Sequence, residues 1–345
     1  MRVTQTMMAR QYTSRISGTL NDLNYVNKQV GTGRKFFKGS ENPAGAAKAY
    51  QLRRQVSQAN DYVANNEDAQ STVNTKQGTL TQVSKALEDV YNNLLGVKTG
   101  TKDQASDKAI VAKLFRGAQE TIINDMNTKY GDKFLFGGNN VSDVPFVLKG
   151  DTLTYRGVDV NGKTDYMWPT GTEKAGQTED SNTLLKQLSG DTLYTDLGFG
   201  LSFKDGEIVS SSVFNTATAG INVLGYGSDG DGLSNNIVSL IGQMATMLEK
   251  DCDPSALDPY LTKFKDLKQN VLNATTQIGS DSMFLEYSQS RLEDIQDNLA
   301  TKVSNTEYID SEEAIMNLNT IDYMYQALLK TGKNILSNSF IDFMS

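Results

Sequence analysis

The side chains that could do chemistry in this sequence are carboxylates, and their spacing favours neither catalysis nor strong metal binding. Asp229 and Asp231 stand in a DGDG run typical of a calcium-binding turn, but the run lacks the further acidic ligands and the bidentate glutamate of a complete loop. Glu312 and Glu313 are consecutive on a predicted helix, so they point apart and make poor acid–base partners. We expect both pairs to be solvated surface carboxylates.

The residues most often used for catalysis are scarce. The chain has no histidine, which removes the commonest general base and the commonest transition-metal ligand. Its single cysteine, Cys252, can form neither an intrachain disulfide nor a zinc cluster, and no imidazole is present to activate its thiol. Gly137 and Gly138 are not followed by the lysine and hydroxyl residue of a phosphate-binding loop. The sequence therefore predicts no catalytic residues, no metal ligands, no cofactor and no enzymatic activity.

The charge balance of the chain is acidic. Its 33 lysine and arginine residues are outnumbered by 41 aspartate and glutamate residues, for a formal net charge of -8. Nucleic-acid binding needs a basic stripe, so we expect no nucleic-acid partner. No stretch approaches the ~20 apolar residues of a membrane span, and the first residues lack the apolar core of a secretory signal. These features predict a cytosolic protein without membrane insertion, unless a dedicated channel exports it.

Both ends of the chain carry apolar residues at steps of three and four, which place them on one face of a helix. The N-terminal stripe contains Met7, Met8, Tyr12, Ile16, Leu20, Leu23, Val26 and Val30. The C-terminal stripe contains Ile315, Leu318, Ile321, Tyr325, Leu328, Gly332, Ile335, Ser339 and Phe343. Matching stripes predict that these helices pair with each other or with neighbouring subunits. The pattern indicates an assembly protein rather than an enzyme.

A long helix is expected to begin near Ala44, after Pro43, and to carry a heptad repeat. Apolar residues follow at steps of seven in two series offset by three, which predicts coiled-coil packing in a helical rod. The predicted rod core contains Val73, Leu80, Val83, Leu87, Val90 and Leu94. A polar break at residues 99–106 lets the chain reverse into a second helix, whose apolar stripe ends at Tyr130. Helices resume at residues 235–250 and again beyond the prolines at 254 and 259.

The middle of the chain has a different pattern. Residues 131–232 contain 17 of the 29 glycines, and their hydrophobic runs are short and separated by turn-like segments. Runs such as VPFVL, LTYRGVDV and INVLGY favour β-hairpins, with one short helix at residues 181–188. We expect an independently packed, β-rich insertion. The fold class is therefore mainly α with an inserted β-rich domain, and a coiled-coil-like rod formed by both the N- and C-terminal parts of the chain.

Several motifs occur in a fixed order along the two flanks. The chain opens with MRVTQTMM and continues, at residues 31–55, with GTGRKFFKGSENPAGAAKAYQLRRQ. DKFLFGGNNVSDVPF follows the second helix at residues 132–146. The return carries YID at 308–310 and YQAL at 325–328, and the chain ends in NSFIDFMS. Together these motifs resemble the flagellin-related family of hook-filament junction proteins, the third hook-associated proteins of bacterial flagella. The matching signature segment contains Gly31, Thr32, Gly33, Arg34, Asn42 and Pro43.

Two alternatives stay open. Filament flagellin is the nearer one, but its segment after the first helix typically carries paired aspartates without a proline, where this chain has Glu41, Asn42 and Pro43. A cytosolic coiled-coil scaffold protein with an inserted β domain is the alternative from another class.

The resemblance implies a flagellin-like structural adaptor that joins the hook-associated zone to the flagellin filament. Its partners would be further copies of itself in a ring, the preceding hook-associated protein, flagellin, and the flagellar export apparatus with its chaperone. It would lie outside the cell in the flagellum, exported without a cleaved signal peptide. We expect terminal helices at residues 1–43 and 305–345, the rod at 44–136 and 233–304, and the β-rich outer domain at 137–232. The expected subunit-interface residues are Met7, Tyr12, Ile16, Leu20, Leu23, Leu328, Ile335, Leu336, Phe340 and Phe343.

Overall fold

The computed structural model describes residues 5–100, 102, 104–168, 176–204, 206–209 and 212–341. The chain divides into two compact units. The terminal unit consists of Met1–Asp61 and Glu293–Ser345, and the rod unit is Tyr62–Leu292. The domain limits expected from the sequence stay predictions. None of the helices in the described ranges is long and apolar enough to cross a membrane.

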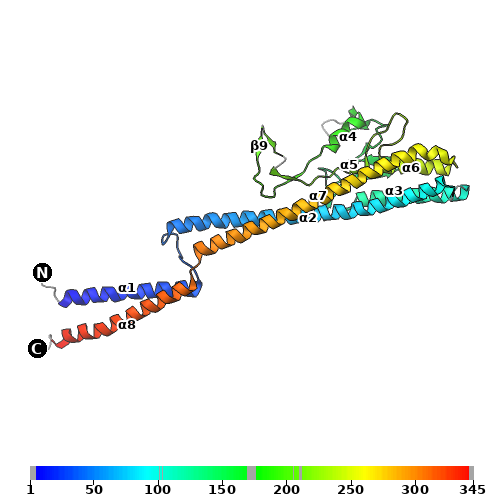
Figure 1. Cartoon of the computed structure of the whole chain (residues 1–345). Helices are drawn as coiled ribbons and strands as arrows, with labels where there is room; N and C mark the ends of the chain where they lie inside the picture. Colours follow the sequence, from blue (N-terminus) through cyan, green and yellow to red (C-terminus); the bar gives the residue numbers. More distant parts are fainter. Residues whose placement is uncertain are drawn as a thin grey trace. The chain divides into compact units, whose positions relative to one another are not determined.

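The terminal unit is helical. It holds α1 (Gln5–Thr32), α8 (Ser311–Ile341), the beginning of α2 (Pro43–Lys98) and the end of α7 (Asp258–Glu307). Helices α1 and α8 pack side by side, with the beginning of α1 and the end of α8 at the same end of the pair (Figure 1). In the other half of this unit, Leu52 and Ala59 of α2 bury their side chains against Leu299 of α7. Both predicted terminal helices are therefore present.

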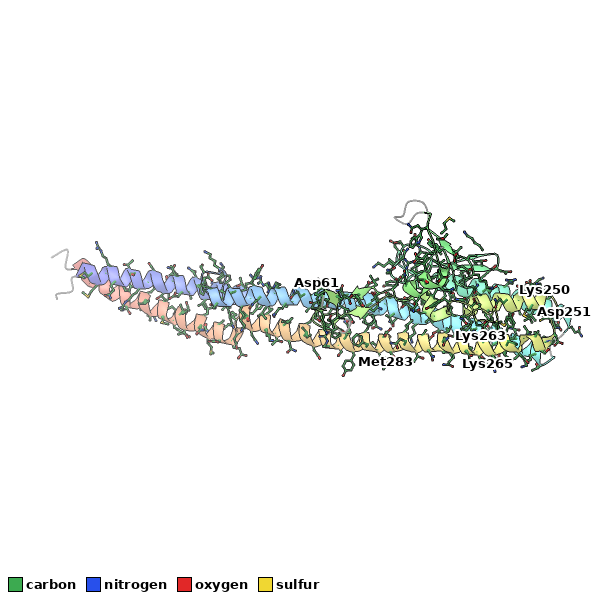
Figure 2. All side chains as sticks on the ribbon, turned by 90° about the horizontal axis from the view of Figure 1, so that it is seen from above. Asp61, Lys250, Asp251, Lys263, Lys265 and Met283 are labelled. Carbon is green, nitrogen blue, oxygen red and sulfur yellow. The ribbon has the colours of Figure 1, made fainter. Side chains whose placement is uncertain are left out.

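The rod unit is built on α2 from Tyr62 to its end and on most of α7, with α3 (Ala105–Met126) packed on α6 (Ile237–Glu249). The heptad positions of α2 point into a continuous apolar core, and Leu80, Leu87 and Leu94 have no exposed surface. On α7, by contrast, Met283 projects into the solvent and is 71% exposed (Figure 2). We call this row of buried heptad residues on α2 the heptad seam. Burying a leucine completely contributes about 1.5–3 kcal/mol, so the seam stabilises the rod unit strongly.

Short strands follow α3. The hairpin of β1 (Lys129–Tyr130) and β2 (Lys133–Phe134) comes first. A three-stranded antiparallel sheet follows, made of β3 (Phe146–Lys149), β4 (Thr152–Tyr155) and β5 (Val158–Asp159). The remaining two-stranded pairs are β6 (Tyr166–Met167) with β7 (Thr178–Glu179), β8 (Tyr194–Thr195) with β11 (Phe214–Asn215), and β9 (Phe203–Lys204) with β10 (Glu207–Ile208). The short helices are α4 (Ser181–Ser189), α5 (Gly220–Leu224) and the 3₁₀ turn η2 (Pro254–Leu257).

The fold class predicted from the sequence is confirmed, but three expectations are wrong in detail. The run INVLGY forms helix α5 instead of a strand. Helix α3 ends at Met126 and not at Tyr130, because the Asn127 side chain turns away to pair with Phe146. The side-chain nitrogen of Asn127 donates to the Phe146 carbonyl oxygen at 2.8 Å, and the side-chain oxygen of Asn127 accepts from the Phe146 N–H at 2.9 Å.

The third expectation concerns the β-rich insertion, which is not independently packed. Phe146, Leu153 and Tyr155 belong to the same buried cluster as Leu80 and Leu87 of the rod. Strand β3 packs against α3 and strand β4 against α6, while the two-stranded pairs are too small to bury a core of their own. The rod unit therefore has one shared core.

Candidate subunit interface

The α1–α8 pair is held by a close contact between a tyrosine and a glycine. The Tyr12 hydroxyl of α1 donates to the Leu328 carbonyl oxygen of α8 at 2.7 Å. A Cβ atom placed on Gly332 would lie only 1.8 Å from the Tyr12 hydroxyl oxygen. A larger residue at position 332, one turn beyond Leu328, would therefore displace the tyrosine hydroxyl. Tyr12 and Leu328, both expected at a subunit interface, here contact each other within one chain.

The other predicted interface residues divide by exposure. Ile16 and Leu23 are half-buried on α1, whereas Met7 and Leu20 are 61% and 39% exposed. Ile335, Leu336 and Phe340 belong to α8, but their side chains lie outside the described part of the chain, and Phe343 lies outside the described residues altogether. The half-buried residues contribute to the helix pair, and a subunit-interface role for the exposed ones stays a prediction.

A second apolar set on α8 was missed by sequence reasoning. These side chains are 48–72% exposed, and none of them is in the C-terminal stripe predicted from the sequence. They are Met316, Tyr323, Met324 and Leu329. Their only sequence signal is that α8 has more apolar residues than one stripe can use. We call them the outer α8 set, and a concentration of large exposed apolar side chains typically marks an interaction surface.

The signature segment forms a tight connection between α1 and α2. Gly33 has a φ of +70°, a left-handed conformation that favours glycine, and Arg34 forms an antiparallel bridge with Tyr308. The Lys35 N–H donates to the Glu307 carbonyl oxygen at 2.8 Å, and the Ile309 N–H donates to the Gly33 carbonyl oxygen at 2.9 Å. These bonds fasten the segment between α1 and α2 to the turn between α7 and α8.

The start of α2 is also explained by this segment. Asn42 caps the helix, because its side-chain oxygen accepts from the Gly45 N–H at 2.9 Å, and Pro43 takes the first helical position. The Glu41 carboxylate accepts from the Phe37 N–H at 2.8 Å, and this bond holds the pKa of Glu41 below its ordinary value. The cap and the proline are as the sequence predicts.

An ion pair reinforces the same region of the terminal unit. The Arg53 guanidinium donates from two nitrogens to the Glu307 carboxylate, and Glu307 is only 5% exposed. Hydrogen bonding to Glu307 raises the pKa of Arg53. A bidentate pair of this kind fixes geometry as well as charge, so it locks α2 to the end of α7.

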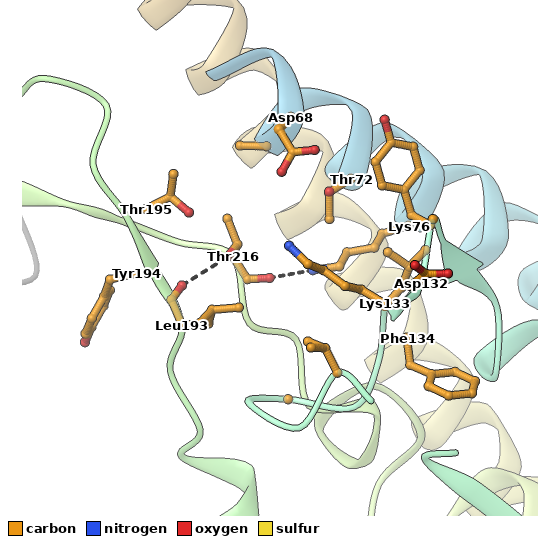
Figure 3. A pocket seen from close by; sticks show the side chains of 16 residues that line it. Asp68, Thr72, Lys76, Asp132, Lys133, Phe134, Leu193, Tyr194, Thr195 and Thr216 are labelled. Carbon is orange, nitrogen blue, oxygen red and sulfur yellow. Dashed lines mark hydrogen bonds between the residues drawn. The ribbon is translucent and has the colours of Figure 1, made fainter. Parts of the chain in front are cut away.

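The rod unit contains a cavity of ≈ 480 Å³ beside a buried lysine. Lys76 of α2 donates to the Thr216 carbonyl oxygen at 2.6 Å (Figure 3). It also donates to the Thr218 hydroxyl at 3.0 Å. Burial lowers the pKa of Lys76 to about 8, although the charge of Asp281 opposes the shift. Through these two hydrogen bonds, the buried amine of Lys76 links α2 to the strand region.

Few groups in the described ranges have the chemistry of a reactive centre. Burial raises the pKa of the half-buried Cys252 thiol, which disfavours the thiolate nucleophile. No group of three or more histidine, cysteine, aspartate or glutamate side chains that could hold a metal occurs among the described residues. The arrangement is therefore better suited to holding helices together than to catalysis.

Long helices from both ends of the chain, flanking a small strand-containing part, define a flagellin-like protein. Residues 3–141 match the family model of the bacterial flagellin N-terminal helical region. A solved structure of a candidate flagellar hook-associated protein from Vibrio parahaemolyticus shares this fold, with a TM-score of 0.58 and 16% identity. The similarity covers 78% of this chain and 100% of that one.

Similarity to curated proteins indicates which flagellin-related proteins this chain resembles. Flagellar hook-associated protein 3 of Escherichia coli (strain K12) is 24% identical over 147 residues, which are 42% of this chain and 46% of that protein. The protein of the same name from Salmonella typhimurium matches to the same extent. The aligned part thus spans less than half the length of the curated relatives. These matches confirm the resemblance to flagellin-related hook-associated proteins that the sequence motifs predict.

Proposed function

We propose that this protein is a structural adaptor of the bacterial flagellum, which joins the hook-associated zone to the flagellin filament. The observation that carries the proposal is the outer α8 set, together with exposed Met7 and Leu20 of α1. Helices α1 and α8 bury one apolar stripe against each other. Their further apolar side chains stay exposed and would contact other molecules. Similarity to proteins named flagellar hook-associated protein 3 supports this assignment.

The proposed partners follow from this position. Further copies of the chain would pack through their α1–α8 pairs into a ring, with the preceding hook-associated protein on one side and flagellin on the other. The flagellar export apparatus and its chaperone would handle the chain before assembly. We propose that it leaves the cell through the flagellar channel without a cleaved signal peptide, and that it acts outside the cell without binding nucleic acid or a membrane.

Filament flagellin is the runner-up function. Flagellin shares the terminal helices, and the family model that matches residues 3–141 is named for flagellin itself. The curated relatives favour the junction protein, as does the motif with Asn42 capping a helix that starts at Pro43.

The phenotype of a strain that lacks the gene for this protein distinguishes these functions. Loss of a junction protein should leave hooks without filaments, visible by electron microscopy, while flagellin accumulates in the medium. Loss of the filament protein itself should remove that flagellin, and loss of a cytosolic scaffold should leave flagella intact. Either of the last two results would reject the proposal.

The interface can be tested in the same strain by complementation. A Met316→Glu and Tyr323→Glu double variant places two charges in the outer α8 set, whose side chains are 63% and 72% exposed. We expect a normally folded subunit that fails to restore filaments. Glu313→Gln, a change at an exposed carboxylate in the first turn of the same helix, is the matched control and should restore them. Full motility of the double variant would show that this surface is not an interface.

We further propose that the protein has no catalytic role. The raised pKa of the Cys252 thiol and the absence of histidine from the sequence support this. Purified protein should show no stoichiometric transition metal and no hydrolysis of peptides or glycans. Turnover that disappears on substitution of a single carboxylate would contradict it.

A further inference from the structure

A cleft of ≈ 570 Å³ lies between α2 and α7 in the rod unit. We call it the polar cleft, and its lining residues are Asn66, Glu67, Gln70, Ser71, Asn74, Glu286 and Gln289. All seven side chains carry an oxygen atom, two are carboxylates, and none is basic or apolar. The spacing of four between the α2 residues, and of three between the α7 residues, brings each set to one face of its helix.

Asn66, one of the lining residues, has a buried side-chain oxygen without a hydrogen-bond partner. The residue is only 1% exposed, and its side-chain nitrogen donates to the Leu285 carbonyl oxygen at 3.1 Å and to the Gln289 side-chain oxygen at 2.9 Å. Its Oδ1 atom is buried and accepts no hydrogen bond. Exchanging the oxygen and nitrogen of the amide would break both donor bonds, so the orientation of the side chain is determined.

Gln70, one turn further along α2, repeats this arrangement. Its nitrogen donates to the Asn74 side-chain oxygen at 3.1 Å and to the Ser282 hydroxyl at 2.8 Å. Its Oε1 atom is likewise buried without a donor. Buried polar atoms are nearly always paired in folded proteins, so two unpaired acceptors in one cleft call for a bound group that satisfies both.

We propose that the polar cleft binds a hard divalent cation of the calcium type. The Asn66 and Gln70 side-chain oxygens would ligate it from α2, and the Glu67 and Glu286 carboxylates would neutralise its charge from the two helices. Calcium takes six to eight oxygen ligands, including amide carbonyls and carboxylates, in flexible geometry. Magnesium prefers a smaller octahedral site that keeps several waters, and transition metals prefer imidazole or thiolate.

The site is expected to be weak but structurally useful. Only two carboxylates line it, so the Kd should be on the order of 10⁻⁴–10⁻³ M, as in extracellular calcium modules. A cation bound there would bridge α2 and α7 at a place where their contact is polar. It would therefore stabilise the rod without changing its fold.

Calcium titration of the full chain tests the proposal. Calorimetry should show one site, and about 10 mM CaCl₂ should raise the melting temperature by about 2–8 °C. The Glu67→Gln and Glu286→Gln double variant should fold, as judged by circular dichroism, and should bind calcium at least about tenfold more weakly. Glu120→Gln, at an exposed glutamate of α3, is the matched control and should keep the wild-type response.

Three outcomes would contradict the proposed calcium site. Absence of binding heat and of any melting shift in the wild-type chain would mean that ordered water or another molecule satisfies Asn66 and Gln70. Equal calcium responses in the wild-type chain and the double variant would place the ion elsewhere. An equal response to MgCl₂ would show general charge screening instead of a calcium-type site.

Discussion

The heptad seam of the rod unit and the α1–α8 pair both have regularly spaced apolar residues, but they differ in how completely these side chains are buried. Leu80, Leu87 and Leu94 of the seam are completely buried, whereas Met7 and Leu20 of α1 are 61% and 39% exposed. The seam lies in a core that α3, α6, α7 and the short strands also build. Two helices alone can close only one stripe, so the remaining apolar side chains of the pair stay available for partners.

The largest effect should come from removing the strands that complete the core of the rod unit. Replacing residues 137–232 by a glycine-serine linker deletes Phe146, Leu153 and Tyr155, which are at most 1% exposed. We expect the remaining rod to lose cooperative thermal unfolding, because α3 and α6 would expose the apolar surface that these strands cover. Circular dichroism melts test this. A sharp transition near the wild-type temperature would show that the helices form a complete core without the strands.

Matched truncations in the two regions compare them directly. Leu87→Ala in the seam should destabilise the subunit by about 2–5 kcal/mol, because it leaves a cavity in a closed core. Leu20→Ala in the terminal pair, where the side chain is 39% exposed, should change stability by about 0.5 kcal/mol or less. Chemical denaturation of both variants measures the difference. Similar losses in the two variants would remove the distinction between a closed core and an open pair.

In the alkaline range, a pH effect should come from Lys76 of the rod unit. Burial lowers the pKa of Lys76 from 10.5 to about 8, so between these values the unfolded chain holds a proton that the folded chain has lost. Stability should therefore rise with pH across this window, by about 3 kcal/mol at most from this group. The raised pKa of the Cys252 thiol, ordinarily 9.0, acts in the opposite direction within this window and reduces the net rise. The raised pKa of Tyr155, about 12, does so above pH 10, so measurements should stop there.

Two variants assign the pH effect to its source. Lys76→Met should flatten the rise of unfolding free energy between about pH 8 and pH 10. Lys133→Met changes an exposed lysine that lines the same cavity, and it should leave the slope unaltered. A slope that persists in Lys76→Met would assign it to other titrating groups.

The smallest effect concerns the close contact inside the terminal pair. Gly332→Ala should displace the Tyr12 hydroxyl and cost about 1 kcal/mol, the usual net value of a hydrogen bond. In a Tyr12→Ala background the same change should be neutral or stabilising, since alanine favours a helix over glycine. Hydrogen exchange of α8 amides measures both. Equal costs in the two backgrounds would mean that Tyr12 and Gly332 do not interact.

Much of the helical framework follows from local sequence patterns. Steps of three and four predicted α1 and α8, and the heptad of α2 predicted which side chains enter the seam. Asn42 and Pro43 predicted the start of α2, because a cap and a first-turn proline satisfy helix ends locally. The hairpins followed from alternation and turn residues. Each of these signals depends on neighbours within a few residues, so one chain is enough to detect them.

Only the tertiary structure decided which distant residues meet. It placed Tyr12 against Gly332, put the strands into the same core as Leu80, and left the buried side-chain oxygens of Asn66 and Gln70 without a hydrogen-bond donor. It also separated the stripe that closes the α1–α8 pair from the outer α8 set. Periodicity tells which face of a helix is apolar, but not how much of that face a partner covers. That depends on packing between segments hundreds of residues apart, which no local pattern encodes.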